Sequence, residues 1–249
     1  MRIVLEITSE KEINLPIQYN HIVQGFIYEN LADEVFRFFI HDEGFEFNKR
    51  KFKLFTFSKI LGKFVIDKIG NRIIFQSPIK LVISSPIDKF INEFGKALLE
   101  KDKFYLGKNN IQISKIEVVN KGNFSDNVKI RTLSPIVIYS TVEENGKKRT
   151  IYHKPGDESF TLLIRRNIEK KYQLLYKKEP PTDDFEIKAA NLEKIRLAVI
   201  NYKNTIIKGY SGDFILKGNP ELISLAYDVG LGSKNSQGFG LFDFVVDHQ

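Results

Sequence analysis

Apolar residues along this chain follow strand-like spacing in some segments and helix-like spacing in others, and the order of these segments recurs in the second half. This repeated order constrains the fold more than any single motif. Apolar residues at every second position predict a strand, and apolar residues three to four positions apart predict a helix. The first half opens with an alternating segment at residues 2–8, and Pro16 is placed to begin a helix that continues to about residue 39. Further strands are predicted at residues 52–58, 64–67, 72–76, 79–84 and 112–119, and a second helix at 86–100.

The same order returns after a polar joint at residues 121–126. The second half is predicted to contain strands at residues 128–134, 137–142, 150–153, 186–188, 194–200, 205–216 and 241–246, and helices at 160–176 and 220–228. Two strand–helix–strand–strand–helix–strand units side by side account for both halves. The sequence therefore predicts an α+β protein of two tandem ferredoxin-like (βαββαβ) domains, at residues 1–121 and 127–249.

The charge of the chain points to a polyanionic partner. The formal net charge is +7, from 38 basic and 31 acidic residues. Division after Ser125 gives 19 basic and 15 acidic residues in the first part and 19 and 16 in the second, so the excess is spread over both parts. An even spread is typical of a long phosphate track across the whole body and favours nucleic-acid binding. The alternative is a soluble protein that is basic for no functional reason.

The absence of cysteine limits the chemistry that the chain can perform. There are no cysteines, which excludes disulfides, cysteine-based zinc sites and thiol nucleophiles, and which fits a cytoplasmic location. The N-terminal segment alternates and carries Glu6, unlike a signal peptide, and no apolar run reaches the roughly 18 residues of a membrane span. We therefore expect a cytoplasmic protein with no membrane segment.

A glycine-rich run, Gly230-Leu-Gly-Ser-Lys-Asn-Ser-Gln-Gly-Phe-Gly240, lies between the last predicted helix and the last predicted strand. Glycine allows the backbone to approach a ligand closely, and successive free N–H groups can form an anion-binding nest. The order helix–loop–strand is the reverse of a Walker A loop or a dinucleotide fingerprint. A plain flexible connector is the alternative. We predict phosphate contact by residues Gly230, Gly232, Lys234, Asn235, Ser236, Gly238 and Gly240.

This run resembles the C-terminal loop of the CRISPR-associated endoribonuclease family that processes precursor crRNA, within the RAMP superfamily. Three further segments resemble family landmarks in the family's order along the chain. They are Leu15-Pro-Ile-Gln-Tyr-Asn-His21 with Gly25-Phe-Ile-Tyr28, Lys53-Leu-Phe-Thr-Phe-Ser58, and Thr132-Leu-Ser-Pro-Ile136. Together these landmarks are spread over nearly the whole chain.

The resemblance implies cleavage of CRISPR repeat RNA within precursor crRNA, with no metal ion and no cofactor. Attack by a 2′-hydroxyl would leave a 2′,3′-cyclic phosphate and a 5′-hydroxyl. The resemblance leaves open a monomer or a homodimer, and binding to a repeat hairpin or to single-stranded RNA. The alternative is a non-catalytic RAMP-type subunit that binds crRNA in an effector complex with other subunits.

The catalytic candidates are Tyr28, His41 and Lys53. Metal-free RNA cleavage needs a base, an acid and positive charge at the phosphorus, and histidine and lysine suit these roles. The resemblance places the family's general-base histidine, helix tyrosine and strand lysine at these three positions. On one continuous helix His41 would point away from Tyr28, so the helix must end near residue 40 for the two to converge.

Several alternatives stand beside this assignment. Tyr28 could instead be an aromatic residue of the core. Lys53 could instead lie on the solvated face of a strand. His21 is the main competitor of His41 as the base, although packing or capping suits it better, and His153 and His248 are given no role. Additional phosphate contacts are predicted at Lys147, Lys148 and Arg149, and are considered for the pairs 165–166 and 170–171, whose alternative is a solvated helix face. No metal site is predicted, because Asp183-Asp184 looks like a solvated turn.

Overall fold

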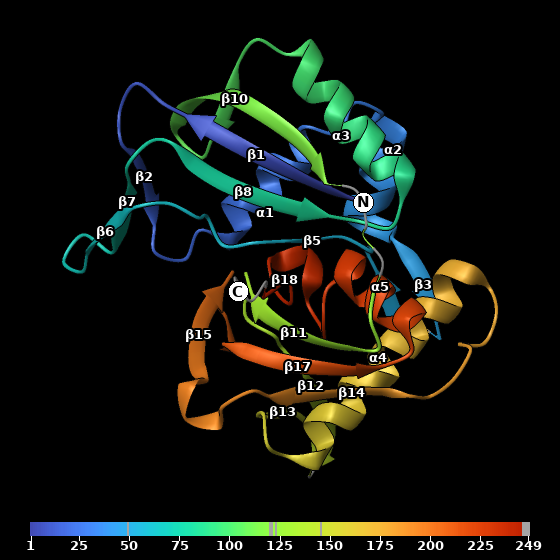
Figure 1. Ribbon diagram of the computed structural model, residues 1–249. Helices are drawn as coiled ribbons and strands as arrows, with labels where there is room; N and C mark the ends of the chain where they lie inside the picture. The colour runs from blue at the N-terminus through green and yellow to red at the C-terminus, as the bar shows by residue number, and fades with distance from the viewer. Residues whose placement is uncertain (49, 120–121, 123, 145, 246–249) are drawn as a thin grey trace.

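The computed structural model describes residues 1–48, 50–119, 122, 124–144 and 146–245. Figure 1 shows the N-terminal half, in blue to green, stacked on the C-terminal half, in yellow to red. The elements of the N-terminal half are β1 (Arg2–Thr8), β2 (Ile13–Pro16), α1 (Asn20–Glu29), α2 (Glu34–Phe38), the π-helical turn η1 (Phe39–Glu43), β3 (Phe45–Phe47), β4 (Arg50–Phe52), β5 (Thr56–Phe57), β6 (Phe64–Asp67), β7 (Arg72–Phe75), β8 (Ile79–Ser84), α3 (Asp88–Glu100), β9 (Phe104–Leu106) and β10 (Asn109–Val119).

The C-terminal half contains a similar set of elements. They are β11 (Asn127–Thr132), β12 (Tyr139–Glu144), β13 (Lys147–Tyr152), α4 (Glu158–Tyr176), β14 (Phe185–Ala189), the 3₁₀ turn η2 (Leu192–Lys194), β15 (Arg196–Tyr202), β16 (Thr205–Ser211), β17 (Asp213–Gly218), α5 (Pro220–Val229), the 3₁₀ turn η3 (Asn235–Gln237) and β18 (Phe242–Phe244). The hairpins β12–β13 and β15–β16 are additions to the basic unit.

The main sheets of the two halves have the same strand order. The N-terminal sheet runs β5-β8-β1-β10, with β9 added at its edge, and the C-terminal sheet runs β14-β17-β11-β18. In each unit this is the order second, third, first, fourth strand, and all neighbouring strands are antiparallel. This is the ferredoxin-like arrangement, so the predicted fold of two tandem units is confirmed. The predicted domain limits remain predictions, because residues 121 and 246–249 lie outside the described part of the chain.

The predicted long helix is wrong, because the chain leaves the helical path between α1 and α2. Asn30 donates from its side chain to the Phe26 carbonyl at 2.8 Å and ends α1. Asp33 then accepts from the Phe36 amide at 2.8 Å and caps α2. Pro16 is the last residue of β2 and does not open a helix. Two side chains that hydrogen-bond to the backbone therefore divide a segment whose apolar spacing predicts one helix.

The predicted strand at residues 52–58 is also divided. Leu54 has a positive φ of 52°, and this kink separates β4 from β5. Its side chain is buried in the C-terminal core, whereas the next residue, Phe55, is buried in the N-terminal core. The predicted strand at 205–216 is similarly split into β16 and β17 at Gly212, where a Cβ would lie 2.6 Å from the Ile195 side chain.

Contacts between the halves come from both ends of the chain. Phe45, Phe47 and Phe52 of the β3–β4 hairpin pack against the C-terminal core. The buried guanidinium of Arg2 lies 3.2 Å from the centre of the Tyr227 ring and donates to the Tyr227 carbonyl at 2.6 Å. The β3–β4 hairpin and the start of the chain therefore hold the N-terminal half against the C-terminal half.

The glycine-rich run folds back on itself between α5 and β18. The Leu231 amide donates to the Gly240 carbonyl, and the Gly240 amide donates to the Pro135 carbonyl, both at 2.9 Å. The side chain of Lys171, on α4, reaches into the loop and donates to the carbonyls of Gly230 and Gly232 at 2.9 Å and to Asn235 Oδ1 at 2.8 Å. The loop is therefore a closed structural unit built around a buried ammonium group.

The substitution Gly240→Ala tests this packing. Gly240 has a φ of +80°, and a Cβ there would overlap the Leu231 carbonyl oxygen. We expect the free energy of unfolding, measured by urea denaturation, to fall by about 3 kcal/mol. Gly146→Ala is the matched control, because Gly146 has a φ of +71° but no atom within 4 Å of a Cβ, so a loss of only about 1 kcal/mol is expected. Equal losses in the two variants would contradict the proposed overlap.

Candidate functional site

The three predicted catalytic side chains lie together. The rings of Tyr28 and His41 meet edge to face, with centroids 4.8 Å apart and an angle of 76° between their planes. The Lys53 ammonium donates to the His41 backbone carbonyl at 2.7 Å. The predicted route to this arrangement is wrong, however, because the chain does not stop being helical near residue 40. The break after α1 changes the direction of the chain, so α2 and η1 do not continue the axis of α1. His41 lies within the π-helical turn η1.

Gly44 sets the distance between His41 and Lys53. It ends η1 with a φ of +70°, and a Cβ there would lie 2.7 Å from the Phe52 carbonyl oxygen and 2.9 Å from Lys53 Cδ. The close approach of β4 to the end of η1 therefore requires glycine.

His41 has a carboxylate partner that sequence reasoning missed. Its Nδ1 lies 2.8 Å from Asp42 Oδ1, and 55% of the His41 side chain is exposed. A carboxylate at this distance accepts the proton of Nδ1–H, which leaves Nε2 as the nitrogen able to take a proton. Only the adjacent position of Asp42 in the sequence hinted at this pairing.

The environments of Tyr28 and Lys53 shift their proton affinities in opposite directions. Burial, and then the nearby Tyr202 and Asp42, raise the pKa of the Tyr28 hydroxyl far above its usual range, so it remains a hydrogen-bond donor. Burial, and then the charge of Lys51, lower the pKa of Lys53, against the opposite influence of Asp42 and Glu43. Lys53 is therefore a better proton donor than a solvated lysine.

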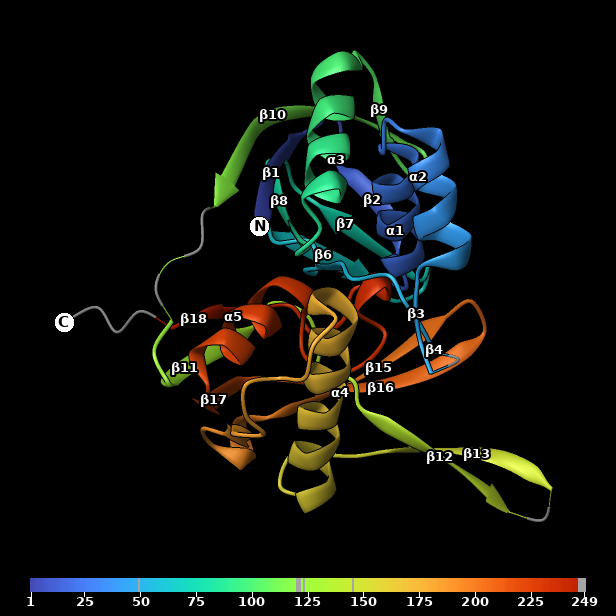
Figure 2. The same ribbon diagram turned by 90° about the vertical axis from the view of Figure 1, so that its right-hand side faces the viewer.

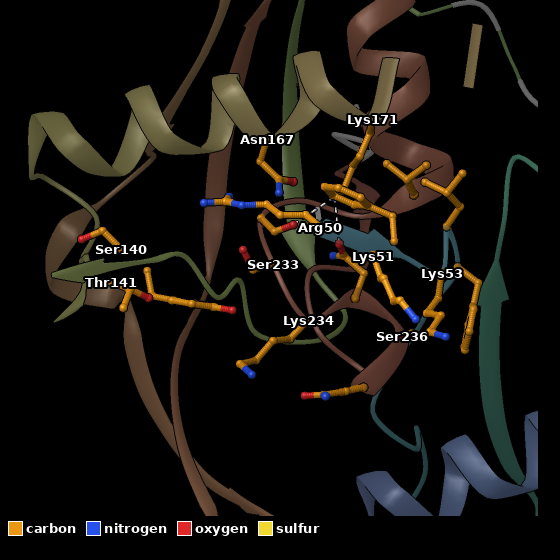
Figure 3. Close-up of a pocket in the computed structure, with 18 residues that line it drawn as sticks. Arg50, Lys51, Lys53, Ser140, Thr141, Asn167, Lys171, Ser233, Lys234 and Ser236 are labelled. Carbon is orange, nitrogen blue, oxygen red and sulfur yellow. Dashed lines mark hydrogen bonds between the residues drawn. The ribbon is translucent and has the colours of Figure 1, made fainter. Parts of the chain in front are cut away.

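A basic cleft of about 520 Å³ lies beside Lys53, between the β4–β5 segment, β12 and the glycine-rich loop (Figure 3). The basic side chains that line it share one cavity although they come from both halves: Arg50, Lys51, Lys53, Lys171 and Lys234. No carboxylate is among the described residues that line it. Lys234 projects over the ring of Tyr139, with Nζ 5.4 Å from the ring centre. The cleft therefore offers a concentrated positive charge next to the candidate catalytic residues.

The glycine-rich loop contributes to this cleft through its side chains more than through its glycines. Gly230, Gly232, Gly238 and Gly240 are buried, and the amides of residues 230, 231, 233 and 237–240 donate to backbone carbonyls within the protein. The side chain of Asn235 is held by Lys171 and by the carbonyls of Leu231 and Phe239. Phosphate contact by the loop remains a prediction, and Lys234 and Ser236 are the members placed to make it.

The remaining basic candidates lie elsewhere. Lys147, Lys148 and Arg149 are exposed on β13, in a hairpin that projects from the body (Figure 2), and they do not line the cleft; their contact with phosphate remains a prediction. Lys171 is buried, so the alternative prediction that this residue lies on a solvated helix face is wrong. Its pKa is lowered by burial to about 7, and the three oxygens around it hold the ammonium in place.

The two other described histidines, His21 and His153, have partners other than His41. His21 packs edge to face on Tyr202, with centroids 6.5 Å apart. The two ring nitrogens of His153 lie 2.9 Å from Ser140 Oγ and 2.8 Å from Ser159 Oγ. His248 lies outside the described residues.

The described residues contain neither a cluster of metal-ligating side chains nor a helix suited to a membrane. Among residues 1–245 with the gaps stated above, no group of three histidine or acidic side chains is arranged to hold a metal ion. No helix in the same part of the chain is long and apolar enough to cross a membrane.

Comparisons with known proteins place the chain among CRISPR-associated proteins. Residues 117–244 match the model of the C-terminal region of the CRISPR-associated protein Cas6. The chain is 30% identical to the CRISPR-associated endoribonuclease Cas6 1 of Methanocaldococcus jannaschii, over 99% of this chain and 94% of that protein. It is 24% identical to the CRISPR-associated endoribonuclease Cas6 of Pyrococcus furiosus, over 97% of this chain and 89% of that protein.

Solved structures agree with these matches. A structure described as CRISPR-associated protein Cas6 superposes with a TM-score of 0.81 at 27% identity, covering 99% of each chain. A Cas6-related protein of Pyrococcus furiosus superposes with a TM-score of 0.86 at 22% identity, covering 100% of this chain and 99% of the other, and supports the fold. The family model matches half of the chain, and the relative from Methanocaldococcus jannaschii matches nearly all of it, so the chain belongs to the Cas6 family.

Proposed function

We propose that this protein is a metal-independent endoribonuclease that cuts CRISPR repeat RNA within precursor crRNA. The observation that carries the proposal is the position of Lys53, which lines the basic cleft and also contacts His41, whose ring lies against Tyr28. A phosphate track and a set of acid–base groups therefore adjoin each other. The names of the relatives from Methanocaldococcus jannaschii and Pyrococcus furiosus support the same activity.

The proposed reaction begins at the 2′-hydroxyl before the scissile phosphate. His41 Nε2 takes the hydroxyl proton, and the 2′ oxygen forms a bond to phosphorus while the bond from phosphorus to the 5′ oxygen breaks. The products are a 2′,3′-cyclic phosphate and a 5′-hydroxyl. The contact of Asp42 with Nδ1 holds the imidazole in the tautomer that can accept this proton.

Lys53 and Tyr28 complete the set. The Lys53 ammonium stabilises the negative charge that develops on the phosphoryl oxygens and gives a proton to the departing 5′ oxygen. Its lowered pKa favours this transfer. The Tyr28 hydroxyl keeps its own proton and donates a hydrogen bond to the reacting group.

The basic cleft would hold the RNA backbone. The four accessible cationic side chains that line it, Arg50, Lys51, Lys53 and Lys234, would replace the counterions of the phosphates, so binding should weaken as salt rises. Lys171 is buried and is held by the loop, so it does not contribute to this contact. A non-catalytic crRNA-binding subunit of an effector complex would use the same cleft without cutting. A homodimer or a monomer, a cytoplasmic location and contacts with other effector subunits remain predictions.

Cleavage in EDTA tests the enzyme against the binding subunit. We expect the purified protein to cut repeat RNA in EDTA, and to bind without cutting an RNA whose 2′-hydroxyl at the scissile site is replaced by hydrogen, because the nucleophile is then absent. Product ends are identified by mass spectrometry. Binding of the unmodified RNA with no cutting would establish the non-catalytic alternative.

The variant His41→Ala tests the base. Loss of a general base should lower the single-turnover cleavage rate by about 10²- to 10⁴-fold while RNA affinity changes little. His21→Ala is the matched control and should cut at the unmodified rate, because His21 packs on Tyr202. Undiminished cutting by His41→Ala, or a large loss in His21→Ala, would overturn the assignment.

The pH dependence tests Lys53 as the acid. The acid must be protonated, and its pKa is lowered, so the cleavage rate should fall as pH rises through a value below that of an ordinary lysine. In Lys53→Arg the guanidinium stays protonated, so the alkaline decline should disappear even if the overall rate is lower. The same decline in both proteins would show that another group causes it.

A further inference from the structure

A second cavity adjoins the candidate catalytic residues. It has a volume of about 530 Å³ and lies between α1 and the α2–η1 segment, with Tyr28 and His41 in its wall. Apart from Asp42, which contacts His41, the other residues of its wall have no part in the proposed reaction. Three features of these walls indicate what the cavity holds.

The first feature is Gly25, in the middle of α1. A glycine inside a helix destabilises it relative to alanine. Gly25 has an ordinary helical φ, and a Cβ there would meet no atom within 4 Å. Neither backbone conformation nor packing within the protein therefore requires glycine at this position. Gly95, in α3, is similar in both respects but does not line the cavity. Gly25 therefore differs from Gly95 in its position, because its missing side chain leaves space in the cavity.

The second feature is Phe38, whose side chain is 60% exposed although it lines the cavity. Its neighbours behave differently, because Phe36 is buried and stacks with Phe39, whose ring centre is 6.4 Å away. An exposed aromatic ring is a stacking platform for an unpaired nucleobase. Phe38 therefore presents such a platform in the cavity that contains His41.

The third feature is the charge of the cavity, which is opposite to that of the basic cleft. Glu29, Glu34 and Asp42 line it, and Arg37 is the only lysine or arginine among the described residues of its wall. Arg37 forms an ion pair with Glu34, with 3.1 Å between Nη2 and Oε1. Carboxylates repel a phosphate but accept hydrogen bonds from the exocyclic amino groups of adenine, cytosine and guanine. The charge therefore favours a base over a phosphate.

We propose that this cavity holds an unpaired, amino-bearing nucleobase next to the scissile phosphate, stacked on Phe38 and lying over Gly25. The inference rests on the proposed RNA cleavage and adds a specificity site to it. Backbone phosphates then occupy the basic cleft, while one base turns toward α1 and brings its ribose to His41.

The variant Gly25→Ala separates stability from function. Alanine should raise the urea midpoint of unfolding, because it favours the helix. It should lower kcat/KM for repeat RNA at least tenfold, because the methyl group enters the space of the base. Gly95→Ala should also raise the midpoint but leave kcat/KM unchanged. Cutting by Gly25→Ala at the unmodified rate would refute the cavity's role.

Removal of the base tests Phe38 directly. With intact RNA, Phe38→Ala should lower the single-turnover rate by about 5- to 150-fold, as expected for the loss of one stacked base. Two further RNAs lack the base on the 5′ or on the 3′ side of the scissile phosphate. For one of these two RNAs, Phe38→Ala and the unmodified protein should cut at the same rate, because the base that stacks on Phe38 is already absent. Phe38→Tyr should retain most of the rate. Val35→Ala should also retain it, because Val35 is 80% exposed on α2 but lies outside the cavity wall.

The outcomes distinguish the two proposals. An unmodified protein that cuts no repeat RNA would refute the proposed function. A protein that cuts, but in which Phe38→Ala lowers the rate equally for the intact RNA and both abasic RNAs, would refute the nucleobase site alone.

Discussion

The glycine-rich loop depends on one buried ammonium group. Lys171 makes three hydrogen bonds to uncharged oxygens of the loop, one of which belongs to the Asn235 side chain. The same side chain donates to the carbonyls of Leu231 and Phe239, so it links Lys171 to both ends of the loop. The fixed loop then meets helix α1, where Gln24 donates to the Ser236 carbonyl at 2.6 Å. Since α1 also carries Tyr28, the far end of the chain positions the helix that contains a catalytic candidate.

The fold could be predicted from the sequence because the order of periodicities allows few arrangements. Alternation in β1 buries Ile3, Leu5 and Ile7 on one face, as the pattern indicates. The predicted long helix failed where polar side chains override apolar spacing, and two predicted strands failed at the backbone kinks of Leu54 and Gly212. Asn30 and Asp33 interrupt a segment that periodicity reads as one helix, because a side chain that caps the backbone contributes nothing to the hydrophobic pattern.

The site was predicted less completely, and for a different reason. The resemblance named Tyr28, His41 and Lys53, and these residues lie in contact, but spacing alone could not place them across a helix break. Lys171 was missed as an internal residue because a lysine beside another lysine on a helix normally faces solvent. The carbonyls that hold it come from about sixty residues further along the chain. Such long-range partners leave no local signal.

The kink at Leu54 has a consequence for how these proteins diversify. Lys53, Leu54 and Phe55 are consecutive, yet they belong to the basic cleft, the C-terminal core and the N-terminal core. The two ferredoxin-like units therefore cannot be exchanged between relatives as independent modules. A chimaera joined at the interdomain linker would place Leu54 in a foreign core and shift Lys53 with it. A substitution that reshapes the C-terminal core around Leu54 would therefore also act on the position of Lys53.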